Sequence, residues 1–175
     1  MKIITLHQPW ASLVALELKR YETRHWATDY RGPLLIHAAK RVMGFSERQL
    51  YLSAIEDGRK LGLGLPPEKV PFAEQLPLGC IVAIADLTKC SQMMNLPGIV
   101  VGWFEADPPE GFTIIQDKSA LEQAVGLWEP GRYALQLDSV RSLSEPIPFK
   151  SRQGKLLDAP ADIVALVNEQ LKEVA

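Results

Sequence analysis

The chemically richest stretch of the chain runs from Gln8 to Trp26. Within nineteen positions it holds an amide, two indoles, two carboxylates and several cations, the main residues being Gln8, Trp10, Lys19, Glu22, Arg24 and Trp26. Such polar groups need hydrogen-bond partners if they are buried, and indole rings are costly to leave in water. Aromatic rings beside charged groups suit a planar polar ligand, so this stretch predicts a site for a nucleobase and its phosphate.

The residue types at the centre of the stretch define its possible chemistry. Lys19 could clamp a phosphate or, if desolvated, act as a base or nucleophile. Glu22 could orient this lysine or accept from a base amino group, and Arg24 could bind a phosphate with two hydrogen bonds. Lys19 and Glu22 are therefore the catalytic candidates. The alternative is an ordinary ion pair between Glu22 and Arg24 on one face of a strand, beside a solvated lysine.

Three further residues of this region are candidates for ligand binding. Gln8 could read a base edge, or it could cap the helix that Pro9 opens. Trp10 and Trp26 could stack on a base. Trp10 also suits core packing, because it lies on an apolar helix face, so Trp26 is the better candidate for stacking.

Three residues farther along add a basic or titratable group. Arg31 could contact phosphate or serve as an ordinary turn residue before Gly32. His37 lies in an apolar strand, where it is either a ligand-binding group or a core histidine bonded to a neighbour such as Glu22. Lys40 belongs to a basic rim that favours phosphate or is simply solvated.

Composition and charge describe an ordinary globule with an uneven charge distribution. The chain has 175 residues, of which 47% are hydrophobic and 23% charged, which suits one domain. The formal net charge is −2, but residues 19–41 hold six cationic and two anionic side chains. This basic face on an acidic body predicts either an anionic ligand or a solvated surface.

Several other classes of site and segment are not expected. Cys80 and Cys90 form no C-x-x-C pair, and His7, His25 and His37 lack ligand spacing. We therefore expect no metal site and no cofactor. The start of the chain lacks a secretory pattern and no apolar run reaches membrane-spanning length, so the expected protein is cytoplasmic and contacts no membrane.

Hydrophobic periodicity and turn residues predict the elements that must position these groups. Strands are expected at 2–6, 21–24, 34–38, 79–87 and 131–137, and helices at 9–18, 46–61, 119–127 and 160–174. Residues 99–104 could be a strand or a buried irregular segment, and 107–111 are a turn-rich loop. Ser46 with Gln49, and Ser119 with Glu122, have the spacing of helix N-terminal caps. The expected fold is α+β, with a small mixed β-barrel of about five to six strands, helical insertions and a C-terminal helix.

Three motifs between residues 4 and 40 carry a family resemblance. They read Q-P-W-A-S-L at 8–13, K-R-x-E-x-R-x-W-x-T at 19–28 and R-G-x-L-x-I-H at 31–37. Weaker similarity continues at 79–82 and 131–135 and extends to 150–154. Together these motifs resemble the ASCH domain (activating signal cointegrator homology) family of the PUA-like superfold. The resemblance implies an ASCH domain over 1–155, with residues 156–175 as a C-terminal helix packed on it.

The family signature G-x-K-x-x-E-x-R matches this chain at three of its four positions. Lys19, Glu22 and Arg24 match, whereas Glu17 stands where the family has glycine. Glycine there would end a helix with a positive φ. Glutamate must therefore either adopt that conformation or lengthen the helix.

The resemblance implies RNA or nucleic-acid binding, and hydrolase activity in some small members. In an amidohydrolase branch that acts on an acetylated cytidine, a lysine, a threonine and a downstream glutamate carry the reaction. Lys19 matches the lysine, but Glu22 occupies the threonine position and Thr23 would face the other side of the strand. Glu74 and Glu105 are candidates for the downstream acid.

Three functions remain open at this point. The first is binding of RNA or a nucleotide-like ligand in a basic cleft. The second is hydrolysis of a modified nucleoside such as N4-acetylcytidine, or of RNA, by Lys19 and Glu22. The third is a protein-interaction adaptor with a protein partner, which Glu17 and the acidic net charge favour slightly.

Overall fold

A computed structural model describes residues 1–96, 99–105, 119–151 and 154–173, with the backbone alone for 94–96, 99–105 and 173. The strands are β1 (Lys2–Leu6), β2 (Tyr21–Arg24), β3 (Gly32–Ala38), β4 (Cys80–Leu96), β5 (Ile99–Glu105), β6 (Tyr133–Pro148) and β7 (Leu157–Asp158). The helices are α1 (Trp10–Ala15), α2 (Phe45–Lys60), α3 (Ala120–Val125) and α4 (Ala161–Glu173), with short 3₁₀ turns at Pro67–Lys69 and Ala73–Gln75.

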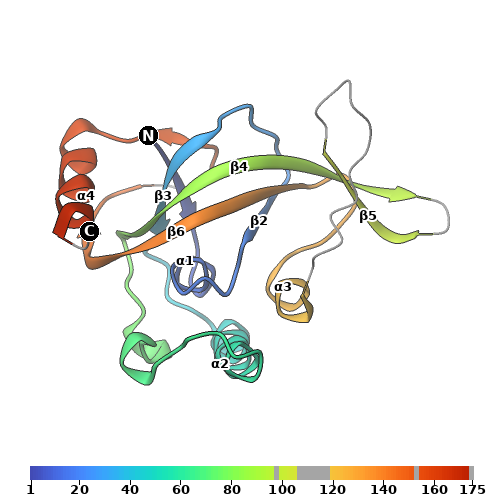
Figure 1. Cartoon of the computed structure of the whole chain (residues 1–175), viewed down its shortest axis with the longest axis horizontal. Helices are drawn as coiled ribbons and strands as arrows, with labels where there is room; N and C mark the ends of the chain where they lie inside the picture. Colours follow the sequence, from blue (N-terminus) through green and yellow to red (C-terminus); the bar gives the residue numbers. More distant parts are fainter. Residues whose placement is uncertain (97–98, 106–118, 152–153, 174–175) are drawn as a thin grey trace.

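The described strands form one mixed, curled sheet. Six of them follow the order β2-β6-β4-β3-β1-β7, and β5 pairs with β4 beyond this path. β1 and β3 are parallel, whereas the other pairs are antiparallel. The long strands β4 and β6 run along the whole sheet, with β5 near one end and α4 near the other (Figure 1). The sheet therefore curls as a half-barrel in which β2 is an edge strand.

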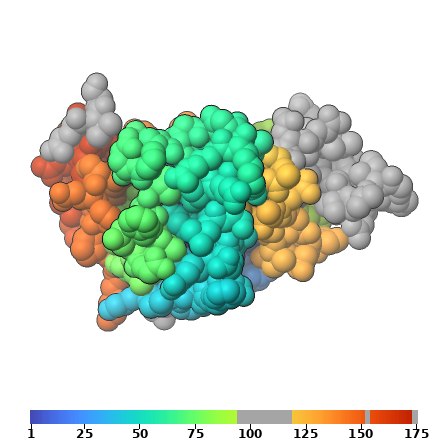
Figure 2. Space-filling view, turned by 90° about the horizontal axis from the view of Figure 1, so that it is seen from below, coloured from blue at the N-terminus to red at the C-terminus, as the bar shows by residue number. Residues whose placement is uncertain are grey.

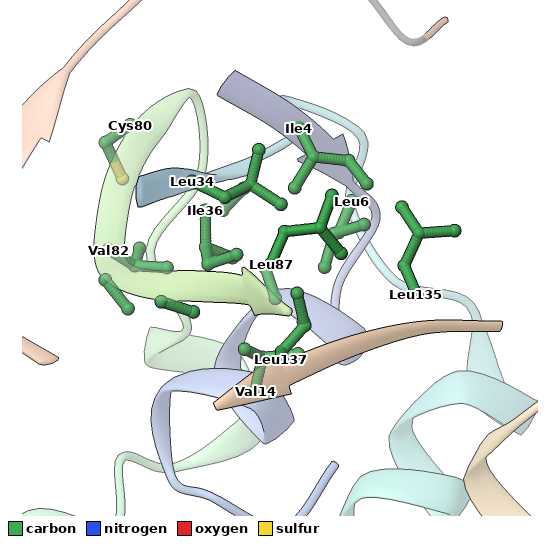
Figure 3. Close-up of a cluster of buried hydrophobic side chains, with 14 of the residues drawn as sticks. Ile4, Leu6, Val14, Leu34, Ile36, Cys80, Val82, Leu87, Leu135 and Leu137 are labelled. Atoms are coloured by element: carbon green, nitrogen blue, oxygen red, sulfur yellow. The ribbon is translucent and has the colours of Figure 1, made fainter. Parts of the chain in front are cut away.

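Alternation along the strands gives the sheet two apolar faces. Ile4 and Ile36 face a cluster that α1 covers through Val14 (Figure 3). Their neighbours Ile3 and Leu35 face the opposite side, where α4 packs. Successive side chains of a strand point to opposite faces, and burial on both sides explains the near-continuous apolar runs of β1, β3 and β4.

A further apolar cluster joins three helices beside the sheet. Leu13 and Leu18, at α1 and just after it, pack with Tyr51 of α2 and with Leu121 and Val125 of α3. Figure 2 shows α2 and the residues that follow it covering this side of the molecule, with α3 beside them. This packing holds α3 close to β2, which borders the candidate site.

The α+β class, the barrel-like mixed sheet and the C-terminal helix are confirmed. Two local expectations are wrong. The first helix ends at Ala15 rather than near Leu18, and Glu17 adopts the left-handed conformation with a φ of 58°. The second helix begins at Phe45 after Gly44, so Ser46 and Gln49 are not its capping pair.

The N-terminal cap that the sequence predicts for the helix at 119–127 is confirmed. The N–H of Glu122 donates to Ser119 Oγ at 3.1 Å, as the expected cap of the third predicted helix requires. Residues 99–104 lie in strand β5. The expected loop at 107–111 lies outside the described residues. The boundary between residues 155 and 156 stays a prediction.

Candidate functional site

Residues from four parts of the chain line a cavity at the edge strand of the sheet, which we call the β2 cleft. Its volume is about 410 Å³. One side consists of Lys19, Glu22, Thr23 and Arg24, and the opposite side of residues 124–127 at the end of α3. The remaining wall comprises Leu6, His7, Trp10, Leu50 and Arg132.

Lys19 lies at the base of the cleft and is almost fully buried, with 1% of its surface exposed. Its Nζ donates to the carbonyl oxygen of Tyr21. The same nitrogen lies 3.7 Å from Glu22 Oε2 and 3.9 Å from Glu122 Oε1. An ammonium group removed from water needs such compensation. Lys19 thus donates a hydrogen bond to a carbonyl group and lies within ion-pair distance of two carboxylates.

Glu22 and Arg24 point the same way from alternate positions of β2, as strand geometry requires. Arg24 Nε lies 3.1 Å from Glu22 Oε1, although the direction of its N–H is poor for a hydrogen bond. Arg24 Nη2 donates to the carbonyl oxygen of Thr5 at 2.8 Å. The glutamate therefore bridges a lysine and an arginine, and all three are buried.

Glu122 connects α3 to the start of β2. Its two carboxylate oxygens accept from the backbone N–H groups of Arg20 at 2.8 Å and Tyr21 at 3.1 Å. Burial raises the pKa of the Glu122 carboxyl group, and this effect outweighs the opposite influence of Lys19 and the two N–H groups. A buried carboxylate beside a lysine has the composition of an acid–base pair.

Two indole rings hold the α3 wall in place. Trp10 Nε1 donates to the carbonyl oxygen of Val125 at 2.8 Å, and Trp128 Nε1 donates to that of Glu122 at 2.7 Å. The N–H of Leu127 also donates to Thr23 Oγ1 at 3.3 Å. Thr23, expected on the far face of the strand, lines the cleft because α3 and the residues after it run beside the free edge of β2.

The structure brings together four of the nine predicted ligand-binding residues. Lys19, Glu22, Arg24 and Trp10 line the β2 cleft. Trp10 contributes an indole whose N–H is already bonded to the opposite wall. The other five candidates are not among the residues that line the cleft.

Gln8 and Trp26 have structural surroundings. Gln8 is fully buried and its amide nitrogen donates to the carbonyl oxygen of Pro77 at 2.8 Å. Its amide oxygen accepts from the N–H of Ser12 at 3.1 Å, as in the alternative of a helix cap. Trp26 is 8% exposed and belongs to the apolar cluster that α1 covers.

His37, Arg31 and Lys40 also lie outside the cleft. The His37 ring contacts Thr5 Oγ1 at 3.2 Å and the carbonyl oxygen of Phe149 at 3.0 Å, rather than Glu22. Burial lowers the pKa of His37. Arg31 is exposed and donates to two backbone carbonyl groups of its own turn. Lys40 is exposed next to Gly79.

The acid next to Lys19 is not one of the two candidates from the sequence. Glu74 pairs at 2.8 Å with Arg48 and is 59% exposed, outside the cleft. The side chain of Glu105 lies outside the described residues. Sequence reasoning identified Glu122 only as part of a helix cap, because a contact between distant segments leaves no local pattern. His7 and Arg132 were likewise not singled out for binding.

Two kinds of feature are not found in the described part of the chain. No group of three or more His, Cys, Asp or Glu side chains there is suited to hold a metal ion. No helix within the same ranges combines the length and apolarity that crossing a membrane requires.

The curled mixed sheet and the polar cleft at its β2 edge define a class, namely small α+β domains with a ligand-sized cavity. The ASCH domain family model matches residues 4–123, which is more than half of the chain, and the chain therefore belongs to the ASCH domain family.

The chain is also similar to activating signal cointegrator 1 from Homo sapiens and Mus musculus. It is 34% identical to each of them over 87 residues. The similar region covers 50% of this chain but only 14% of either relative. The chain thus corresponds to a small part of the length of these proteins.

Proposed function

We propose that this ASCH domain binds RNA or a nucleotide-like ligand in the β2 cleft. The observation that carries the proposal is the convergence of Lys19, Glu22 and Arg24 with Trp10 on one cavity of about 410 Å³. Small-molecule sites commonly have volumes of about 300–1,000 Å³ and few, well-placed polar groups. Membership of the ASCH family also favours a nucleic-acid ligand.

The lining of the cleft suits a base more than an extended apolar ligand. Trp10 offers an aromatic surface, and aromatic contacts with single bases contribute about 1–3 kcal/mol each. The carboxylate of Glu22 could accept from an exocyclic amino group of the base. Arg24 and Lys19 supply donors for carbonyl or phosphate oxygens. Since the cleft is small, the ligand would enter as a single unstacked nucleotide rather than as a duplex.

A blocking substitution tests this proposal without altering the buried charges. Ala124 is an exposed residue of α3 that lines the cleft, so Ala124→Trp should fill it. Ala120→Trp is the matched control, because Ala120 is exposed on the same helix but outside the cleft. Binding of short fluorescent single-stranded RNAs, measured at two salt concentrations, should fall at least about tenfold for Ala124→Trp only. Equal affinities of the two variants would reject the β2 cleft.

The same protein and labelled RNAs also distinguish nucleic-acid binding from the third alternative, a protein-interaction adaptor. A pull-down dominated by protein, with no nucleic acid copurifying and no binding of the labelled RNAs, would favour the adaptor.

The position of Lys19 supports a second candidate, hydrolysis of a modified nucleoside or of RNA. Its ammonium group lies within 4 Å of both Glu22 and Glu122, a combination of donor and acids that suits proton transfer. For N4-acetylcytidine, water would attack the amide carbonyl, the C–N bond would break, and cytidine and acetate would form. Glu122 does not line the cavity itself but lies 3.9 Å from Lys19, and burial raises its pKa, so it is our candidate for exchanging the proton with Lys19.

Chromatographic analysis of incubated substrate tests the second candidate. Wild-type protein should release cytidine from N4-acetylcytidine or shorten a structured RNA, and Lys19→Arg and Glu122→Gln should each abolish the reaction. Glu74→Gln is the control, because that acid pairs with Arg48 rather than with Lys19. Turnover that survives Lys19→Arg at the wild-type rate would assign the activity to another site or a contaminant.

A further inference from the structure

Three residues that line the β2 cleft hold a buried nitrogen atom without a hydrogen-bond partner among the described residues. These atoms are His7 Nδ1, Arg24 Nε and Arg132 Nε. Burying a donor or acceptor without a partner costs about 1–3 kcal/mol. Such atoms are rare in folded proteins, and three of the five found among the described residues belong to this one cavity, whereas Arg48 Nε and Ser91 Oγ lie outside its lining. Their concentration indicates a ligand that supplies hydrogen-bonding atoms at this wall.

Arg132 is held in a fixed position at the wall. Its Nη2 donates to the carbonyl oxygen of Thr23 at 3.1 Å. The next residue, Tyr133, pairs with Arg24 in the ladder between β2 and β6. Two guanidinium groups are therefore brought to the same end of the edge strand. Arg132 Nε has no hydrogen-bond partner among the described residues, and Arg24 Nε has only the poorly directed contact with Glu22 at 3.1 Å.

Charge balance distinguishes Arg132 from the other cations of the cleft. Lys19 and Arg24 are matched in number by Glu22 and Glu122, which lie next to them. Among the side chains that the structure describes, no carboxylate forms an ion pair with Arg132. Its charge is therefore the one that no described carboxylate compensates at the wall, and the half-buried Arg132 lines the cavity.

We propose that Arg132, assisted by Arg24, binds a phosphate group, so that the cleft recognises a phosphorylated nucleotide rather than a free nucleoside. This inference rests on the proposed binding function and specifies its ligand. A guanidinium group matches the geometry of phosphate oxygens and forms charge-assisted hydrogen bonds with them. The base would lie toward Trp10 on the same cavity wall, and His7 would add a third polar atom near the ligand.

The phosphate could belong to a free nucleotide or to the backbone of an RNA strand, and the choice of ligands separates the two. Calorimetry or NMR titration would compare cytidine, cytidine monophosphate, inorganic phosphate and a short single-stranded RNA. We expect the wild-type protein to bind the monophosphate or the RNA at least about tenfold more tightly than the nucleoside. A preference for the monophosphate indicates a free nucleotide, and binding of the RNA alone indicates an RNA strand. Either preference supports a phosphate contact if the preference is lost when Arg132 is replaced.

Three variants test the role of Arg132. Arg132→Gln should remove most of the preference for phosphate, so that the affinities for cytidine monophosphate and for cytidine become similar. Arg132→Lys, which retains charge without the planar fork, should have an intermediate preference. Arg31→Gln is the control, since Arg31 is an exposed arginine outside the cleft. Urea unfolding of each variant identifies any that fails to fold, and Arg132→Lys then serves as the test variant.

Failure of this inference differs from failure of the proposed function. If Ala124→Trp lowers affinity but Arg132→Gln changes the affinities for cytidine and its phosphorylated forms equally, or not at all, the phosphate contact is refuted and binding in the cleft stands. If none of the ligands binds the wild-type protein, both proposals fail.

Discussion

The carboxylate of Glu122 lies 3.9 Å from the ammonium group of Lys19, although the two residues come from opposite halves of the chain. Both side chains are buried, and the same carboxylate accepts the first backbone N–H groups of the edge strand. One residue therefore compensates a buried charge and also completes the start of β2. This double role makes Glu122 a structural support of the cleft, which Lys19 itself lines.

Replacement of Lys19 by methionine should destabilise the protein strongly. Lys19→Met would leave Glu122 without its cation, and removing one partner of a buried ion pair commonly costs about 3–5 kcal/mol. Urea unfolding would measure the loss. The control is Arg20→Met, because Arg20 pairs with Asp138 at an exposed position, where an ion pair contributes about 0–1 kcal/mol. Similar losses for the two variants would contradict the compensation that we assign to Lys19.

A substitution at Glu17 should stabilise the protein. This residue occupies the left-handed region, with a φ of 58°, at the position where the family signature has glycine. The left-handed conformation costs a residue with a Cβ about 1–2 kcal/mol, which glycine would avoid. Glycine also increases the conformational entropy of the unfolded chain, and this effect offsets part of the stabilisation. We expect Glu17→Gly to raise the free energy of unfolding by roughly 0.5–1 kcal/mol.

The matched control for this change is Glu17→Ala. It removes the same carboxylate but retains the Cβ, so it should not reproduce the gain. If alanine stabilised as much as glycine, the backbone conformation would not be the cause.

The elements could be predicted from the sequence much better than the site. Alternation and apolar runs mark β1, β3 and β4, because each of these strands is buried on both faces of the sheet. The local spacing of Ser119 and Glu122 correctly indicated a helix start. The same spacing could not show that the glutamate side chain reaches across to Arg20 and Tyr21, because that contact depends on how distant elements pack.

Local sequence also explains why only some of the candidate residues could be assigned correctly to the cleft. Lys19, Glu22 and Arg24 are close in sequence and share one strand edge, so their proximity followed from local geometry. Trp26 and His37 have the same residue types that a ligand would require, yet the structure places them in apolar and hydrogen-bonded surroundings away from the cleft. Residue type alone could not distinguish these positions.

His37 should make stability depend on pH below neutrality. Burial lowers its pKa in the folded protein, whereas in the unfolded chain the value returns to about 6.5. The unfolded state then binds more protons between the two values, so this contribution to stability is complete above pH 6.5 and decreases as the pH falls toward the lowered pKa. Urea midpoints measured from pH 5 to pH 8 should show this decrease.

His37→Gln isolates the effect, because glutamine keeps a donor and an acceptor but does not titrate. The difference in unfolding free energy between wild type and variant should shrink as the pH falls below 6.5, since contributions from other groups cancel. A difference that is constant over the whole range would contradict the assignment.

Trp10 should couple the stability of the α3 wall to ligand affinity. Trp10→Phe keeps an aromatic ring in the cleft but removes the N–H that donates to Val125, and the loss of such a bond costs about 1–2 kcal/mol. Relative to wild type, native-state hydrogen exchange should therefore accelerate more in α3 than in the sheet, because the wall loses a hydrogen bond to the rest of the fold. Affinity for single-stranded RNA should fall by roughly three- to tenfold, because the loosened wall must be ordered again on binding.

Trp26→Phe provides the comparison for this last prediction. It makes the same chemical change in an indole that lies in the apolar cluster rather than in the cleft. Loss of packing there should lower the unfolding free energy without a selective change in hydrogen exchange of α3 or in RNA affinity. If the two variants lowered affinity equally, reduced global stability would explain both results, and the bond between Trp10 and Val125 would have no specific role in shaping the cleft.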